Sequence, residues 1–163
     1  GSTKLAAERS VMESGLSWCI IRTVLVYGNI LTGNRSNIIS WVQENLSSGK
    51  KIKVVSDQQR TPTYVGDLAK GILLAIEKNA TGVYHISGEE LLSPHDMAMA
   101  VADHLGLDKS LIEKVDASLF YNQPNALLKR FIIDKAKNDL GFQPLNFLEG
   151  MKRMLGTGVP AAT

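Results

Sequence analysis

The chain has very little cysteine, because Cys19 is the only one among its 163 residues. A single thiol cannot close a disulfide within the chain, which excludes a disulfide scaffold and favours a reducing, cytoplasmic location. Charge of one sign is also scarce, since 18 Lys and Arg residues nearly balance 16 Asp and Glu residues to a net charge of +2. So small a net charge does not predict nucleic acid as a partner.

Long apolar runs are absent as well. The apolar residues 20–21 and 24–26 are separated by Arg22 and Thr23, and no stretch approaches the roughly 20 apolar residues of a membrane span. The first residues are polar and lack the basic and apolar regions of a signal peptide. The hydrophobic fraction of 44% and the charged fraction of 21% are ordinary for a soluble globular domain, so we expect no membrane partner.

Motifs that bind phosphate or metal are missing. Gly28 and Gly33 are the nearest candidates for a glycine-rich turn, but they do not form Gly-x-Gly-x-x-Gly. The sequence has no Cys-x-x-Cys and no His-Glu-x-x-His, and its three histidines lack metal-ligand spacing, so no metal site is predicted. We therefore expect that this chain alone does not bind a dinucleotide tightly.

What the sequence does contain is an alternation of strand and helix patterns. Short apolar runs predict strands over residues 18–21, 52–55 and 83–86. Apolar spacings of three and four predict helices over residues 3–14, 36–48, 65–76, 93–105 and 147–155, and a mostly helical pattern after residue 107. Ser36 is a candidate helix cap, and Ser93-Pro94-His95-Asp96 is typical of a helix start. The alternation predicts an α/β fold with a partly parallel sheet, as one unit over residues 1–155 and a flexible tail over residues 156–163.

Four stretches, taken in order, resemble the C-terminal half of an extended short-chain dehydrogenase/reductase, most closely of the dTDP-4-dehydrorhamnose reductase type. They are GSTKLAAE (1–8), IIRTVLVYG (20–28), DQQRTPTYV followed by DLA (57–65 and 67–69), and GVYHISG (82–88). The resemblance implies the C-terminal part of a Rossmann-type NAD(P)-binding fold, a few strands with surrounding helices, lacking the N-terminal nucleotide-binding half. The tyrosine of the family's Tyr-x-x-x-Lys signature would lie one position before Gly1, so we expect a fragment.

The resemblance also implies roles for single residues near the cofactor. Lys4 corresponds to the lysine of the signature, which binds the nicotinamide ribose of NAD or NADP and lowers the pKa of the catalytic tyrosine. Thr23, at the end of a strand, is implied as a contact of the sugar or of the nicotinamide carboxamide. Leu25 stands where the family often has an aromatic substrate contact.

Three further residues are implied on the substrate side. Asn37 corresponds to a sugar or pyrophosphate contact, although on the residues alone it is equally a helix cap. Gln58 and Arg60 belong to the loop that closes over the nucleotide sugar, where a guanidinium can bind phosphate through two hydrogen bonds.

The chain is therefore expected to bind a dTDP-4-keto-sugar as the substrate side of an NAD(P)-dependent reductase, and to be inactive alone. One alternative is a non-catalytic regulatory or binding subunit, favoured by Leu25 and by the missing Arg-Pro pair after Gln123-Pro124, for which Arg130 is the nearest replacement. The other is part of a UDP-sugar epimerase or dehydratase. Strand edges left unpaired predict self-association, with a homodimer through the first helix.

Overall fold

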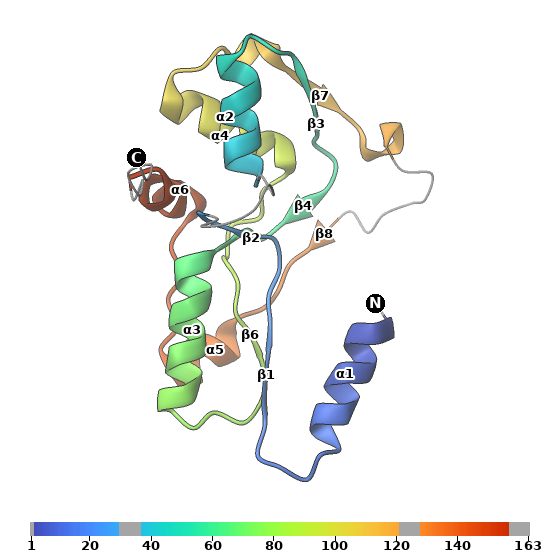
Figure 1. The fold of residues 1–163 in the computed structure, drawn as a ribbon, viewed down its shortest axis with the longest axis vertical. Helices are drawn as coiled ribbons and strands as arrows, with labels where there is room; N and C mark the ends of the chain where they lie inside the picture. Colours follow the sequence, from blue (N-terminus) through green and yellow to red (C-terminus); the bar gives the residue numbers. More distant parts are fainter. Residues whose placement is uncertain (1, 30–36, 121–127, 157–163) are drawn as a thin grey trace, which may run out of the picture.

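The computed structural model describes residues 2–29, 37–120 and 128–156, in which helices and parallel strands alternate along the chain (Figure 1). The α-helices are α1 (Ser2–Met12), α2 (Ile38–Ser47), α3 (Val65–Glu77), α4 (Pro94–Leu105), α5 (Asp134–Leu140) and α6 (Phe147–Gly156). The strands are β1 (Cys19–Arg22), β2 (Val26–Tyr27), β3 (Ile52–Val55), β4 (Gln59–Arg60), β5 (Thr63–Tyr64), β6 (Gly82–His85), β7 (Ile112–Val115) and β8 (Leu128–Lys129). Two 3₁₀ turns span Lys109–Leu111 and Ala117–Leu119.

Every strand pair in the described residues is parallel, which confirms the predicted α/β architecture. β1 pairs with β6, β2 with β5, β3 with β7 and β4 with β8. Arg22 lies opposite His85 in the register of β1 and β6, and the Ile86 N–H donates to the Arg22 carbonyl at 2.9 Å. The residues that follow these two strands therefore leave the sheet at the same edge, where α/β proteins place their ligand crevices.

The helix boundaries follow from local side-chain chemistry. Ser93 and Asp96 form the capping box that the sequence predicts at the start of α4. Gly106 and Gly141 end α4 and α5 with φ values of 65° and 70°, a left-handed conformation that favours glycine. The cap of α2 is Asn37 and not Ser36, which lies outside the described residues.

Two apolar clusters hold the elements together. The larger cluster packs α2, α4 and α6 against β3, and includes Ile39, Val42, Val101 and Met151 with no exposed surface. The second packs α3 and α5 against β6, around Ile86 and Phe142. Figure 1 shows the first group in its upper part and the second in its lower part, with β2, β4 and β8 between them. The segments that join the two groups carry most of the sequence-predicted site.

The segment after residue 107 differs from the prediction. It contains β7 and β8 besides short helical turns, because Ile112–Val115 pairs with β3 and Leu128–Lys129 pairs with β4. Residues 157–163, predicted as a flexible tail, lie outside the described residues. Within the described ranges no helix is long and apolar enough to cross a membrane, and no group of three acidic, His or Cys side chains is arranged to hold a metal ion.

Candidate functional site

Three segments meet at the edge of the sheet where β1 and β6 end. The Thr63 hydroxyl donates to the Val24 carbonyl at 2.7 Å, and the Thr63 N–H donates to the Leu25 carbonyl at 3.1 Å. The Thr23 hydroxyl donates to the Thr63 hydroxyl oxygen at 3.5 Å. Thr63 is fully buried. Its hydrogen bonds join residues 23–25 to the loop that contains residues 61–63.

The third segment is the end of β6, which is in close contact with the same loop. A Cβ atom added to Gly88 would overlap the carbonyl oxygen of Pro62, so only glycine allows this approach. Ser87 is fully buried, and its hydroxyl donates to the Gly88 carbonyl at 2.9 Å. Residues 23–25, 58–63 and 86–88 thus meet at the carboxyl ends of β1 and β6. We call this junction the edge crevice, after the place where α/β proteins bind their ligands.

Arg60 is held in a defined position within the edge crevice. Its backbone exchanges two hydrogen bonds with Leu92, each 2.9 Å long. Its guanidinium donates from Nη2 to the Gln58 side-chain oxygen at 3.1 Å and from Nη1 to the Gln59 carbonyl at 3.0 Å. These contacts use part of the fork of five donors and fix the orientation of the guanidinium.

Two buried polar atoms in this loop have no hydrogen-bond partner among the described residues. They are the amide nitrogen Nε2 of Gln58 and the hydroxyl oxygen of Thr61. Gln58 is 8% exposed and Thr61 is not exposed at all. Buried donors without a protein partner are uncommon, and each costs about 1–3 kcal/mol, so they mark this loop as a candidate for ligand contact.

The residues expected near a cofactor lie at the same end of β1. Thr23 directly follows β1 and is exposed. Leu25 has a φ of 43°, a conformation that costs energy for a side chain with a Cβ, and it is 42% exposed. The Thr63 hydrogen bond to the Leu25 carbonyl fixes the backbone at this strained residue. Strained backbone is typical of functional sites, although it does not by itself reveal the ligand.

Lys4 lies on α1, a helix in which no residue is buried. Its side chain is exposed, and its ammonium has no hydrogen bond or ion pair among the residues that the structure describes. Four residues later, Glu8 pairs with Arg22 through two hydrogen bonds, one of them 2.9 Å from Nε to Oε1. The Arg22 guanidinium lowers the pKa of the Glu8 carboxyl. Sequence reasoning missed Glu8, although its spacing of four from Lys4 places both on one helix face.

Asn37 has all of its polar atoms engaged within the protein. Its side-chain oxygen accepts from the N–H groups of Ile39 at 2.9 Å and Ser40 at 3.1 Å, which caps α2. Its side-chain nitrogen donates to the Gly28 carbonyl at 2.8 Å. The structure thus shows the cap role, and none of these hydrogen bonds of Asn37 reaches the edge crevice. Contact with a ligand stays a prediction.

A buried carboxyl lies in the first turn of α3. Asp67, in the first turn of α3, is 6% exposed and accepts a hydrogen bond of 2.8 Å from the Leu145 N–H. Burial raises the pKa of the Asp67 carboxyl, and the hydrogen bond from Leu145 opposes this only in part. Together with Glu90, whose carboxylate accepts from the Phe147 N–H, Asp67 fixes the segment that leads into α6.

The remaining candidate residues and one large hollow do not belong to the edge crevice. Residues 121–127, which include Gln123-Pro124, lie outside the described residues, and Arg130 follows β8 as an exposed side chain. A hollow of about 410 Å³ lies at the amino end of β1, lined by Trp18, Ile21 and the second half of α3. None of the sequence-predicted site residues lines that hollow.

Two residues of the chain could hold one end of a nicotinamide cofactor. Lys4, whose ammonium has no partner among the described residues, could bind a ribose, and Thr23, which is exposed, could bind a carboxamide. The sequence offers no Gly-x-Gly-x-x-Gly turn for a pyrophosphate, so the residues at hand fit the nicotinamide half and not the rest of the molecule.

Comparison with known proteins identifies relatives of the chain. Residues 1–158 match the family described as the RmlD substrate binding domain. The chain is 28% identical over 138 residues to the probable low-salt glycan biosynthesis reductase Agl14 of Haloferax volcanii, covering 82% of this chain and 45% of that protein. It is 30% identical over 120 residues to the methionine adenosyltransferase 2 subunit beta of Xenopus tropicalis, covering 71% of this chain and 36% of that protein.

A solved structure shares the fold. The dTDP-4-dehydrorhamnose reductase of Bacillus anthracis, in complex with NADP, superposes with a TM-score of 0.81 and 25% identity over 94% of this chain and 53% of that one. The chain thus spans about half the length of the reductases that it matches. This likeness confirms the predicted fold, the substrate-binding part of a Rossmann-like reductase.

Proposed function

Because the chain belongs to the RmlD substrate binding domain family, we propose that it binds a dTDP-4-keto-sugar as the substrate side of an NAD(P)-dependent reductase. The observation that carries this proposal is the edge crevice. There a buried amide nitrogen of Gln58 without a partner lies beside the oriented guanidinium of Arg60. Similarity to a probable glycan biosynthesis reductase supports the same class of reaction.

Each residue of the crevice is assigned a part in holding the substrate. Arg60 binds the pyrophosphate with the donors that Gln58 and Gln59 leave free, because a planar guanidinium matches phosphate oxygens. Gln58 donates from Nε2 to the base or the sugar. Thr23 hydrogen-bonds the sugar beside the reacting carbon, and Leu25, held exposed by its strained backbone, packs against the sugar face.

Lys4 is assigned to the cofactor side. Its ammonium binds the nicotinamide ribose hydroxyls, and its positive charge favours the ionised form of a neighbouring tyrosine. A nicotinamide cofactor, when bound, supplies the hydride for the 4-keto carbon. The 163 residues contain no Gly-x-Gly-x-x-Gly turn that could hold the pyrophosphate of the cofactor. We therefore propose that these residues by themselves bind the nucleotide sugar without reducing it.

Calorimetric titration tests the proposal. The chain is titrated with dTDP-glucose, which is a stable analogue of the 4-keto-sugar, and with UDP-glucose. We expect dTDP-glucose to bind more tightly, and Arg60→Met to weaken it about tenfold or more, because a charge-assisted hydrogen bond is lost. Arg9→Met removes an exposed arginine outside the crevice and serves as the control. Tighter binding of UDP-glucose would favour the epimerase or dehydratase alternative.

The second candidate is a non-catalytic subunit, which the similarity to a methionine adenosyltransferase subunit beta favours. It predicts a stable complex with the methionine adenosyltransferase of the same organism in size-exclusion chromatography. It also predicts that neither dTDP-glucose nor UDP-glucose binds. Nucleotide-sugar binding that Arg60→Met abolishes, without complex formation, would contradict this second candidate.

A further inference from the structure

The ion pair between Glu8 and Arg22 is the one side-chain link that we find between α1 and another element among the described residues. No residue of α1 is buried, so apolar packing does not fix how this helix is rotated. The Arg22 guanidinium contacts both oxygens of the Glu8 carboxylate, a planar arrangement that sets orientation as well as distance. The pair therefore decides which face of α1 is turned toward β1.

Lys4 lies on that same face. Residues four apart on a helix are neighbours, and Lys4 precedes Glu8 by about 6 Å along the helix axis. Figure 1 shows α1 running antiparallel to β1, with its N-terminal end toward the end of β1 that leads into Thr23. With Glu8 level with Arg22, the turn that carries Lys4 extends in the direction of Thr23 and of the edge crevice.

The pair also decides what Lys4 can bind. A glutamate four residues after a lysine is its nearest partner on a helix, and such a pair would neutralise the ammonium. In this structure both oxygens of Glu8 are occupied by Arg22, and the Lys4 ammonium has no partner among the described residues. Because Arg22 binds the Glu8 carboxylate, Glu8 does not pair with Lys4, and the Lys4 ammonium stays available to a ligand.

From these observations we infer that Glu8 and Arg22 are positioning residues for Lys4: they dock α1 on β1 and keep the Lys4 ammonium free for the nicotinamide ribose. Neither residue touches the ligand. The inference rests on the proposed cofactor role of Lys4. The ion pair explains how α1, a helix without buried residues, can hold Lys4 at a defined place.

The test uses the polypeptide as its gene encodes it, with NADPH as the probe. Glu8→Gln and Arg22→Met each break the ion pair, and Glu8→Arg combined with Arg22→Glu restores it with the charges exchanged. Asp103→Asn breaks the exposed pair of Lys109 with Asp103, which is 2.7 Å long and distant in sequence, and is the matched control. Two quantities are measured: hydrogen exchange of the α1 amides and the dissociation constant for NADPH from nicotinamide fluorescence.

We expect both single variants to speed exchange in α1 severalfold and to weaken NADPH binding about twofold to fivefold, the range open to a partly exposed ion pair. The exchanged pair should restore both quantities, and Asp103→Asn should change neither. In a Lys4→Met background, Glu8→Gln should still speed exchange but should cause no further loss of NADPH affinity.

Two results would overturn the inference, and they differ in meaning. If Lys4→Met weakens NADPH binding while Glu8→Gln does not, the pair holds the helix without positioning the lysine, and the proposed function stands. If Lys4→Met itself leaves NADPH binding unchanged, the cofactor role of Lys4 fails and the positioning role fails with it.

Discussion

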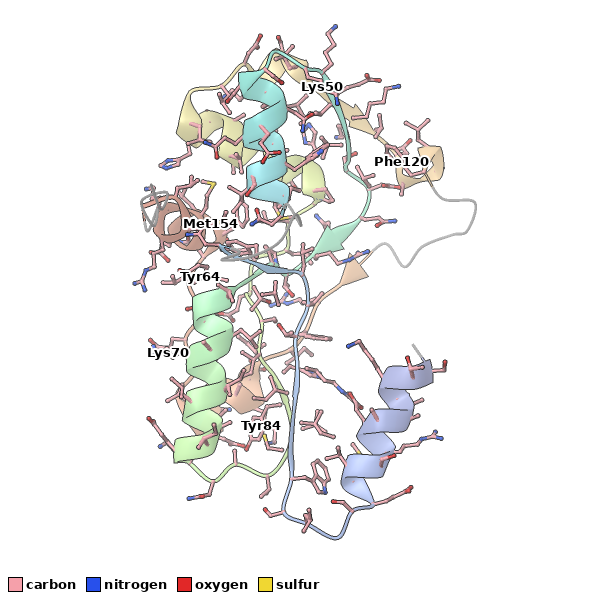
Figure 2. All side chains as sticks on the ribbon, viewed as in Figure 1. Lys50, Tyr64, Lys70, Tyr84, Phe120 and Met154 are labelled. Carbon is pink, nitrogen blue, oxygen red and sulfur yellow. The ribbon has the colours of Figure 1, made fainter. Side chains whose placement is uncertain are left out.

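The hydroxyl of Tyr27 occupies the place where a side chain on residue 150 would begin. A Cβ atom added to Gly150 would overlap the Tyr27 oxygen and would lie 3.0 Å from its ring carbon Cζ. The same hydroxyl donates to the Phe147 carbonyl at 3.3 Å, and the two rings lie 5.2 Å apart. The ring of Tyr64, which directly precedes α3, lies 5.9 Å from the ring of Tyr27, and Figure 2 shows Tyr64 at the upper end of α3. β2, α3 and α6 therefore meet at one point, directly after the strained residue Leu25.

Gly150→Ala tests this contact. Alanine is favoured over glycine inside a helix by about 1 kcal/mol, so helix propensity alone would raise the free energy of unfolding. The overlap with Tyr27 reverses the sign, and we expect a net loss of about 1–3 kcal/mol in urea denaturation. Tyr27→Phe should recover part of that loss, since the ring carbon and Tyr64 Cβ, 3.1 Å away, still crowd the site. Gly156→Ala, with open space around it, should cost nothing.

Asp67→Asn tests the buried carboxyl. Burial raises the pKa of Asp67 above the ordinary value of 3.8, so the folded state holds this proton more tightly than the unfolded state does. The contribution of Asp67 to stability is therefore largest below its ordinary pKa and declines as the pH rises through the raised one. An asparagine keeps an acceptor for the Leu145 N–H and carries no charge.

The measurement is the difference in unfolding free energy, wild type minus Asp67→Asn, between pH 4 and pH 7. We expect this difference to become more negative as the pH increases. A difference that does not change with pH, or one that becomes more positive, would show that the ionised carboxylate is not penalised by burial.

Asn37 variants separate a cap from a ligand contact. Asn37→Ala removes the acceptor for Ile39 and Ser40 and should lower the free energy of unfolding by about 1–2 kcal/mol. Asn37→Ser keeps a capping oxygen and should recover most of that loss. Because every polar atom of Asn37 is engaged in the protein, we expect Asn37→Ser to change dTDP-glucose affinity by less than about twofold. A loss like that of Arg60→Met would establish Asn37 as a direct ligand contact.

Gly88→Ala tests how the edge crevice is held. The added Cβ would displace the Pro62 carbonyl and, with it, the loop that carries Gln58 and Arg60. We expect dTDP-glucose affinity to fall about tenfold or more, together with a loss of stability of about 1–3 kcal/mol. Gly49→Ala is the control for a loss of stability without a change in affinity, because Gly49 has no neighbour within 4 Å and alanine there is strained only by the positive φ of 72°.

Self-association follows from the apolar side chains that α1 exposes. Leu5, Val11 and Met12 are 49%, 41% and 37% exposed. We expect a dimer at tens of micromolar in sedimentation velocity, and a monomer when Leu5 and Met12 are both changed to Ser. Leu119→Ser changes a leucine that is 55% exposed on a 3₁₀ turn and should leave the dimer intact. A wild-type monomer at these concentrations would contradict the prediction.

Local patterns in the sequence predicted most of the elements because their causes are local. The capping box at Ser93, the apolar stripe of α2 and the glycine ends of α4 and α5 each depend on a few neighbouring residues. β7 was not predicted, since Ile112–Val115 becomes a strand by pairing with β3, some 60 residues earlier in the chain. No local pattern contains that partner.

The candidate site, too, was predicted from the sequence only in part. The loop containing Gln58 and Arg60 was found from the sequence by resemblance, but the buried, unpartnered Gln58 nitrogen required the folded chain. The sequence left open whether Asn37 is a helix cap or a ligand contact. The hydrogen bonds to Ile39, Ser40 and Gly28, which need the folded chain, show that it is the cap. The pairing of Glu8 with Arg22 joins residues 14 positions apart, beyond the reach of helix periodicity.

The most direct test of the central claim is a titration of the isotope-labelled chain with dTDP-glucose, followed by amide chemical shifts in NMR spectra. The account predicts saturable shifts at residues 23–25, 58–63 and 87–88, with the Gln58 side-chain amide among the largest because its Nε2 gains an acceptor. Shifts confined to the hollow around Trp18 and Ile76, or none at millimolar dTDP-glucose, would contradict it.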